Sequence, residues 1–158
     1  MFETGAITEV LCERFSPDGL GRPAGHPERV QWLIWVHFAE TITQHSAALT
    51  QQHVALREDH MRSPIVMKLE AARIGKCYAA LEARLTGRDY LLDGGFSAAD
   101  VSVGQAVYLA RFFAHLDAFP AVAAWYSRIT ARAGFKASLP GKDTLFEGTF
   151  FAPWELPA

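Results

Sequence analysis

The chain has 158 residues, of which 50% are apolar or aromatic, and this is enough for one domain with a core of its own. A formal charge of −2 without long runs of one sign excludes the basic footprint of a nucleic-acid-binding protein. No apolar run approaches the roughly 20 residues of a membrane-spanning helix, and no signal peptide opens the chain. The two cysteines lie outside any CxxC pattern and favour a reducing compartment. We therefore expect a cytoplasmic protein that has neither nucleic acid nor a membrane as a partner.

Apolar residues recur at helical spacing from end to end, without an alternating strand pattern, so the sequence predicts an all-α fold. Residues 1–16 form a first short helix, and the Gly- and Pro-rich residues 17–25 form a linker. A second helix is expected from about residue 26 to residue 57. Its apolar run 32–36 covers the whole circumference of a helix, so we expect this run to be buried on every side, by this domain or by a neighbour.

A third helix is signalled by Ser63 as N-cap, by Pro64 in the first turn and by Gly87 at its end. It should pair with the second helix as an antiparallel hairpin. Its apolar stripe, at alternating spacings of three and four, consists of Met67, Ala71, Ile74, Tyr78, Leu81 and Leu85.

The next helix starts at a capping box in which Ser97 can cap the amide of Asp100 and the Asp100 carboxylate can reach back to the amide of Ser97. An isolated Asp in apolar surroundings could also be a general base, but the spacing favours the cap. The helix that follows, to about His115, is apolar nearly all round, which predicts a place in the middle of a bundle.

A further helix should follow Phe119 and Pro120 and end near Gly134, which gives about five to six helices in all. Residues 26–141 then form the helical bundle. Pro and Gly interrupt every pattern in the extended, aromatic C-terminal tail, residues 142–158, which we expect to dock on the domain or on a partner chain. The apolar residues of the tail that support this are Leu145, Phe146, Phe150, Phe151, Trp154 and Leu156.

The histidines do not have metal-ligand spacing. His37, His45, His53 and His60 are seven or eight residues apart, whereas neighbouring ligands on a helix need a separation of three or four. We therefore expect no metal, and the sequence offers no residue that we assign as catalytic.

Three segments in this order resemble bacterial glutathione S-transferases. Residues 2–7 (F-E-T-G-A-I) are similar to the F/L-E-S-G-A-I element at the start of the last helix of the thioredoxin-like half. Residues 35–40 (W-V-H-F-A-E) are close to the W-L-H-F-A-E element of the first helix in the C-terminal domain. Residues 96–101 match the family's F-[ST]-x-A-D capping motif. At residues 132–135 the chain has R-A-G-F where the family usually has R-P-A-[FY], and this affects the end of the last helix rather than the resemblance.

The resemblance implies a helical C-terminal domain preceded by the last helix of a thioredoxin-like domain, here residues 1–16. It also implies glutathione as co-substrate, with Glu3 and Thr4 at its γ-glutamyl end, and an electrophile pocket to which Trp35, His37 and Glu40 could contribute. The thiol-activating part of the family's thioredoxin-like half has no counterpart in these residues, so we expect the chain to be inactive by itself.

Two functions follow as alternatives. One is the family reaction, conjugation of the glutathione thiolate to a small hydrophobic electrophile. The other is a non-catalytic helical module of the same fold for dimerisation or partner binding. In both cases we expect a homodimer or higher oligomer, because the face that the family covers with the thioredoxin-like half would be open.

Overall fold

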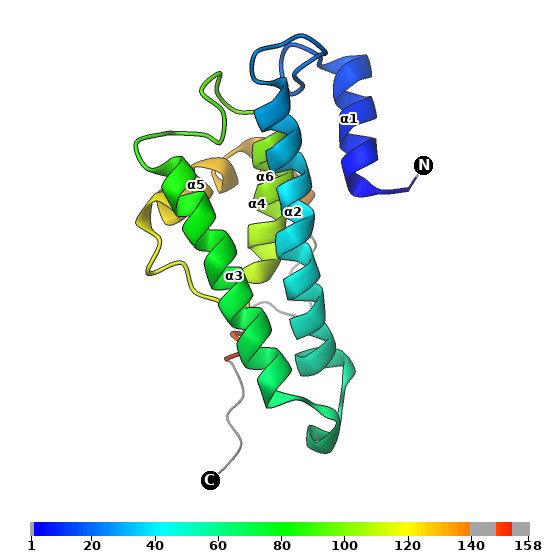
Figure 1. Cartoon of the computed structure of the whole chain (residues 1–158), viewed down its shortest axis with the longest axis vertical. Coiled ribbons are helices and arrows are strands. Elements are labelled where there is room, and N and C mark those ends of the chain that lie inside the picture. The colour runs from blue at the N-terminus through cyan, green and yellow to red at the C-terminus, as the bar shows by residue number, and fades with distance from the viewer. Residues whose placement is uncertain (1, 140–147, 153–158) are drawn as a thin grey trace.

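The computed structural model describes residues 2–139 and 148–152, and it is all-helical over that part of the chain. Two long helices form an antiparallel pair, a third lies behind them, and the first helix stands on the outer side of the pair (Figure 1). The elements are α1 (Thr4–Phe15), α2 (Arg29–Thr50), a π-helical turn (Gln51–Ala55), a 3-10 turn (Asp59–Met61), α3 (Pro64–Leu85), α4 (Ala98–Ala110), α5 (Pro120–Thr130) and α6 (Ala133–Ser138).

The core surrounds α4, as its apolar circumference predicts. Small side chains dominate this helix and allow α2 and α5 to approach it closely; for example, a Cβ on Gly104 would lie 2.5 Å from Cδ1 of Ile129 on α5. α4 is shorter than expected, because the amides of Phe113 and Ala114 both donate to the carbonyl of Ala110 and the chain turns there instead of continuing to His115. The buried residues of α4 are Ala98, Ala99, Asp100, Val103, Gly104, Ala106, Val107 and Ala110.

α2 begins later and ends earlier than its sequence pattern suggests. Glu28 is the N-cap residue rather than part of the first turn. Its carboxylate does not cap the helix but accepts hydrogen bonds from Arg22 and from the amide of Gly94. At the other end the α-helix widens after Thr50 into the π-helical turn, which the 3.0 Å hydrogen bond from the Leu56 amide to the Gln51 carbonyl closes. Such turns are rare and have no simple sequence signal.

The run 32–36 is not buried all round within this chain. Trp32, Trp35 and Val36 are buried against the core, whereas the side chain of Ile34 is 48% exposed. On α3, by contrast, the predicted stripe faces inward, with only Ala71 less than fully buried. The Ser63 hydroxyl accepts from the amide of Val66 at 3.3 Å, which caps α3 where the sequence predicts it.

The described part of the C-terminal tail, residues 148–152, lies on the domain. The Phe151 amide donates to the carbonyl of Phe112 at 2.8 Å, and the Phe151 ring stacks on Phe113 and lies 5.3 Å from the ring of His53. Phe150 stacks on His115. The other aromatic and apolar tail positions used in the prediction, Leu145, Phe146, Trp154 and Leu156, lie outside the described residues.

Candidate functional site

The N-terminus of α1 carries the residues that the sequence assigns to glutathione. Glu3 and Thr4 are both exposed, and Glu3 is the N-cap residue but makes no side-chain cap. Its backbone has φ 71° and ψ 108°, the one positive φ of a non-glycine residue in the described part of the chain. Such a conformation is costly for a residue with a Cβ, and it recurs at functional sites. The first turn of α1 therefore has no side-chain cap and begins at an exposed acidic residue with a positive φ.

His37 is the predicted pocket residue that lies against this end of α1. A Cβ on Gly5 would come within 2.8 Å of the His37 ring, so a larger residue there would push this exposed ring aside. The ring also lies 2.9 Å, Nε2 to Oε1, from the Glu9 carboxylate, one turn further along α1. Glu9 in turn pairs with Arg29, which fixes the first turn of α2 to the middle of α1.

The other two predicted pocket residues lie elsewhere. Trp35 is buried, packs edge-on against Phe38 at 5.3 Å, and has an indole N–H without a partner within the described residues. Glu40 is exposed. Glu40 lies three residues after His37 and shares its exposed face of α2, whereas Trp35 lies on the buried side of the helix.

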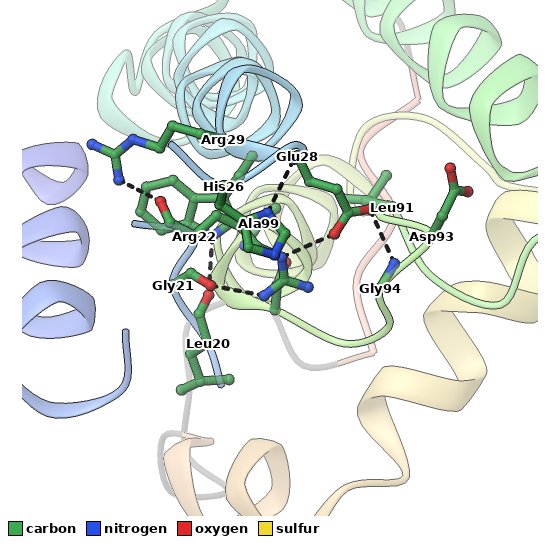
Figure 2. Close-up of polar contacts among 12 residues, drawn as sticks. Leu20, Gly21, Arg22, His26, Glu28, Arg29, Leu91, Asp93, Gly94 and Ala99 are labelled. Carbon is green, nitrogen blue, oxygen red and sulfur yellow. Dashed lines mark hydrogen bonds and ion pairs between the residues drawn. The ribbon is translucent and has the colours of Figure 1, made fainter. Parts of the chain in front are cut away.

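A polar cluster that the sequence did not indicate fixes the linker to the bundle (Figure 2). The buried Arg22 donates to Glu28 at 2.9 Å and to the carbonyls of Gly21 and Gly19, and the second carboxylate oxygen of Glu28 accepts from the amide of Gly94 at 3.0 Å. Partial burial opposes ionisation of Glu28, but the Gly94 amide and the Arg22 guanidinium outweigh it and hold the pKa below its usual value. The cluster places the linker, and through it α1, relative to α2.

Asp100 lies at the centre of the capping motif and is fully buried. One carboxylate oxygen accepts from the Leu91 amide at 3.0 Å and from the Trp125 indole at 2.9 Å, and the other accepts from the Ser97 amide at 2.9 Å. The Ser97 hydroxyl accepts from the Ala99 amide, which completes the capping box. Burial raises the pKa of Asp100, and these hydrogen bonds oppose that shift. With both oxygens occupied, Asp100 is a structural group and not a free base.

A cavity in the described structure lies away from the predicted pocket. It has a volume of about 630 Å³, is partly open to solvent, and is lined by residues of α4, the end of α5, α6 and the linker. None of residues 3, 4, 35, 37 and 40 lines it. Within the described residues no group of three or more His, Cys, Asp or Glu side chains could hold a metal ion, and no helix is long and apolar enough to cross a membrane.

These features together define a helical domain in which the short helix α1 is bound to the first long helix, α2, through Glu9, Arg29 and His37. Residues 51–128 match the family model for the glutathione S-transferase C-terminal domain. Over these residues, just under half of the chain, the sequence has the pattern of a glutathione S-transferase C-terminal domain. A sequence search of curated proteins finds no match.

Solved structures of glutathione transferases share this fold. One from Phanerochaete chrysosporium with oxidized glutathione superposes with a TM-score of 0.77 at 18% identity, over 87% of this chain and 63% of that one. One from Methylobacillus flagellatus with glutathione bound gives 0.77 at 23% identity, over 89% and 70%. One from Burkholderia graminis, with two glutathione molecules per subunit, gives 0.74 at 23% identity, over 87% and 58%. At these identities the likeness concerns the fold, and the chain spans less than two thirds of the first and third of these proteins.

Proposed function

We propose that the chain is the helical half of a glutathione transferase, and that Glu3 and Thr4 form the edge of its glutathione site. The observation that carries this proposal is the backbone of Glu3 at φ 71° beside the uncapped start of α1. Free amides and the positive end of a helix dipole favour a carboxylate, the Thr4 hydroxyl adds a donor, and Glu3 can accept from an ammonium group. The γ-glutamyl end of glutathione carries both groups.

The chemistry of the family reaction requires a group that lowers the pKa of the glutathione thiol, because the thiolate is the nucleophile. Neither buried cysteine fits that task, since burial raises the pKa of both Cys12 and Cys77. We infer that a thioredoxin-like half supplies this group, that the electrophile is small and hydrophobic, and that the protein works in the cytoplasm.

Glutathione binding and turnover test separate parts of this proposal. In a ¹H–¹⁵N spectrum, millimolar glutathione should shift the amides of residues 4–7, and Thr4→Val should reduce those shifts. Thr130→Val, on α5, is the matched control and should leave them unchanged. With glutathione and 1-chloro-2,4-dinitrobenzene, the 158-residue chain should show no turnover above the uncatalysed rate. Turnover by this chain alone would contradict the need for a second half, and absent shifts would contradict the site.

A second candidate, a non-catalytic module for dimerisation, is favoured by one specific observation. The outer face of α3 carries Ile65 and Leu69 one turn apart, 71% and 51% exposed. An exposed apolar pair on a helix is a candidate contact surface, and comparable pairs lie on α1 (Leu11 and Phe15) and α2 (Val30 and Ile34). We propose that this face holds two copies of the chain together, in the enzyme or in the module.

A further inference from the structure

The cavity between α4, α5 and α6 has the size and composition of a small-molecule site. Its volume of about 630 Å³ lies within the range of roughly 300–1,000 Å³ that is common for ligand pockets. Apolar side chains form most of its wall, namely Leu20, Phe96, Val101, Ile129 and Phe135. Such a lining binds an apolar chain or ring.

Arg132 is the one basic side chain among the described residues that line the cavity, and it is exposed. Its guanidinium carbon lies over the Phe96 ring, 3.7 Å from the ring centre. Within the described residues no carboxylate pairs with Arg132 or with Arg111, which also lies over aromatic rings, whereas Arg22, Arg29, Arg88 and Arg128 each have an acidic partner. A stacked guanidinium keeps its N–H edge available for two parallel hydrogen bonds to a carboxylate.

The other polar groups on the wall do not pair with this guanidinium. Asp100 also lines the cavity, but both of its oxygens accept hydrogen bonds from the Leu91 and Ser97 amides and the Trp125 indole, and it forms no ion pair with Arg132. Gln105 and Ser138 are uncharged donors and acceptors at the wall. The cavity therefore combines an apolar lining with a guanidinium group that has no carboxylate partner among the described lining residues.

We propose that this cavity binds a small amphiphilic monocarboxylate, with its carboxylate on Arg132 and its apolar part against Val101, Ile129 and Phe135. The inference is independent of the glutathione site, because none of the residues around Glu3 lines the cavity.

Calorimetric titration with decanoate and with decanol distinguishes the contribution of the ligand's carboxylate from that of its alkyl group. Decanoate should bind more tightly than decanol, which has the same chain length without the charge. Arg132→Gln should lower the affinity for decanoate by at least about tenfold and leave decanol unchanged. Arg111→Gln is the matched control. Arg111 also lies over aromatic rings, Tyr108 at 5.0 Å and Phe112 at 4.8 Å, but it does not line the cavity. This control should alter neither affinity.

A second variant tests the location independently of the charge. Val101 is 52% exposed on α4, so Val101→Trp can fill the cavity without entering the core, and it should abolish binding of both ligands while the melting temperature stays close to that of the native chain. The proposal is overturned if the native chain fails to bind decanoate at millimolar concentration, if decanol binds as tightly, if both arginine variants lose affinity equally, or if folded Val101→Trp still binds.

Discussion

The buried carboxylate of Asp100 supports more of the fold than a helix cap alone. It accepts from an amide at the start of α4, from the Leu91 amide in the preceding loop and from the Trp125 indole on α5. Asp100→Asn replaces one acceptor by a donor, so at least one buried N–H loses its partner. We expect the free energy of unfolding to fall by about 2–3 kcal/mol in a urea titration, since a buried donor without a partner costs about 1–3 kcal/mol and the cap adds to this.

Asp93→Asn is the control for this change, because Asp93 is exposed and pairs with Arg88 at the surface. It should change the unfolding midpoint far less than Asp100→Asn does. Equal effects of the two substitutions would show that the buried hydrogen bonds of Asp100 contribute little.

We expect the stability of the protein to depend on pH through His53. The His53 ring packs beside the stacked rings of Phe113 and Phe151, its Nε2 is buried without a partner among the described residues, and burial, assisted by Arg62, lowers its pKa. The folded protein therefore binds this proton less readily than the unfolded chain does. The contribution of neutral His53 to stability is fully present above the ordinary histidine pKa of about 6.5 and is lost progressively as the pH falls from there toward the lowered value.

Urea unfolding at a series of pH values checks this sign. The native chain should lose stability between about pH 7 and pH 5, and His53→Phe should reduce that loss by removing the titrating group from the aromatic stack. His60→Gln, in the exposed 3-10 turn, serves as the control and should leave the pH dependence unchanged. A steeper loss in His53→Phe than in the native chain would reverse the assignment.

At the scale of the elements, the Glu82 side chain on α3 caps the N-terminus of α5. The two carboxylate oxygens of Glu82 accept from the amides of Ala121 and Val122 at 3.0 and 2.9 Å, where Phe119 offers no side-chain cap and Pro120 has no N–H. We expect Glu82→Gln to lower the free energy of unfolding by about 1 kcal/mol, because it removes both a charge-assisted cap and a favourable charge at the helix N-terminus. Glu58→Gln, at an exposed position outside the α-helices, is the comparison and should have a smaller effect in the same titration. No difference between the two would mean that water caps α5 equally well.

The helices that could be predicted from the sequence are those with local start signals. Ser63 with Pro64, and Ser97 with Asp100, lie within three residues of the amides they serve, so their spacing alone contains the information. The extra turns could not be predicted in this way. The π-helical turn depends on how the α2–α3 connection packs, and α6 is a separate six-residue helix where the apolar pattern had suggested only the end of α5.

The candidate site was less predictable than the fold, because its contacts join residues that are far apart in the sequence. Glu28 and Gly94 are 66 positions apart, so no local pattern indicates the cluster that fixes the linker. The close approach of Gly5 to His37 likewise joins two helices. His37 and Glu40 share an exposed face of α2 but Trp35 is buried on the other side, so closeness in sequence alone does not define a pocket.

At the scale of the whole molecule, α1 is held differently from the rest. Its contacts with α2 are chiefly polar, from Glu9 to Arg29 and His37 and from Glu13 to Arg29, whereas α3, α4 and α5 share the apolar core. Ion pairs near the surface contribute little free energy, so α1 depends less on apolar packing than α3, α4 and α5 do. The proposed glutathione edge thus lies on an element whose position depends on what else covers it.

The outer face of α3 provides a test of assembly. Ile65 and Leu69 lie on the side of α3 opposite the buried Met67 and Ile74. Their side chains therefore cannot pack against the core of their own chain. We expect the native chain to scatter light as a dimer or larger species at micromolar concentration, because association removes this apolar surface from water. Ile65→Glu should shift the mass to that of a monomer, since it would bury an unpaired charge in the interface.

Val30→Glu introduces the same charge at a comparably exposed position, 66% exposed near the start of α2, outside the α3 face. It should leave the native mass unchanged if α3 forms the contact. A native chain that is monomeric across the micromolar range would contradict assembly itself. Dissociation by Val30→Glu but not by Ile65→Glu would instead assign the interface to α2, where Ile34 is also exposed. The two variants together therefore show which of the two long helices forms the contact between the copies.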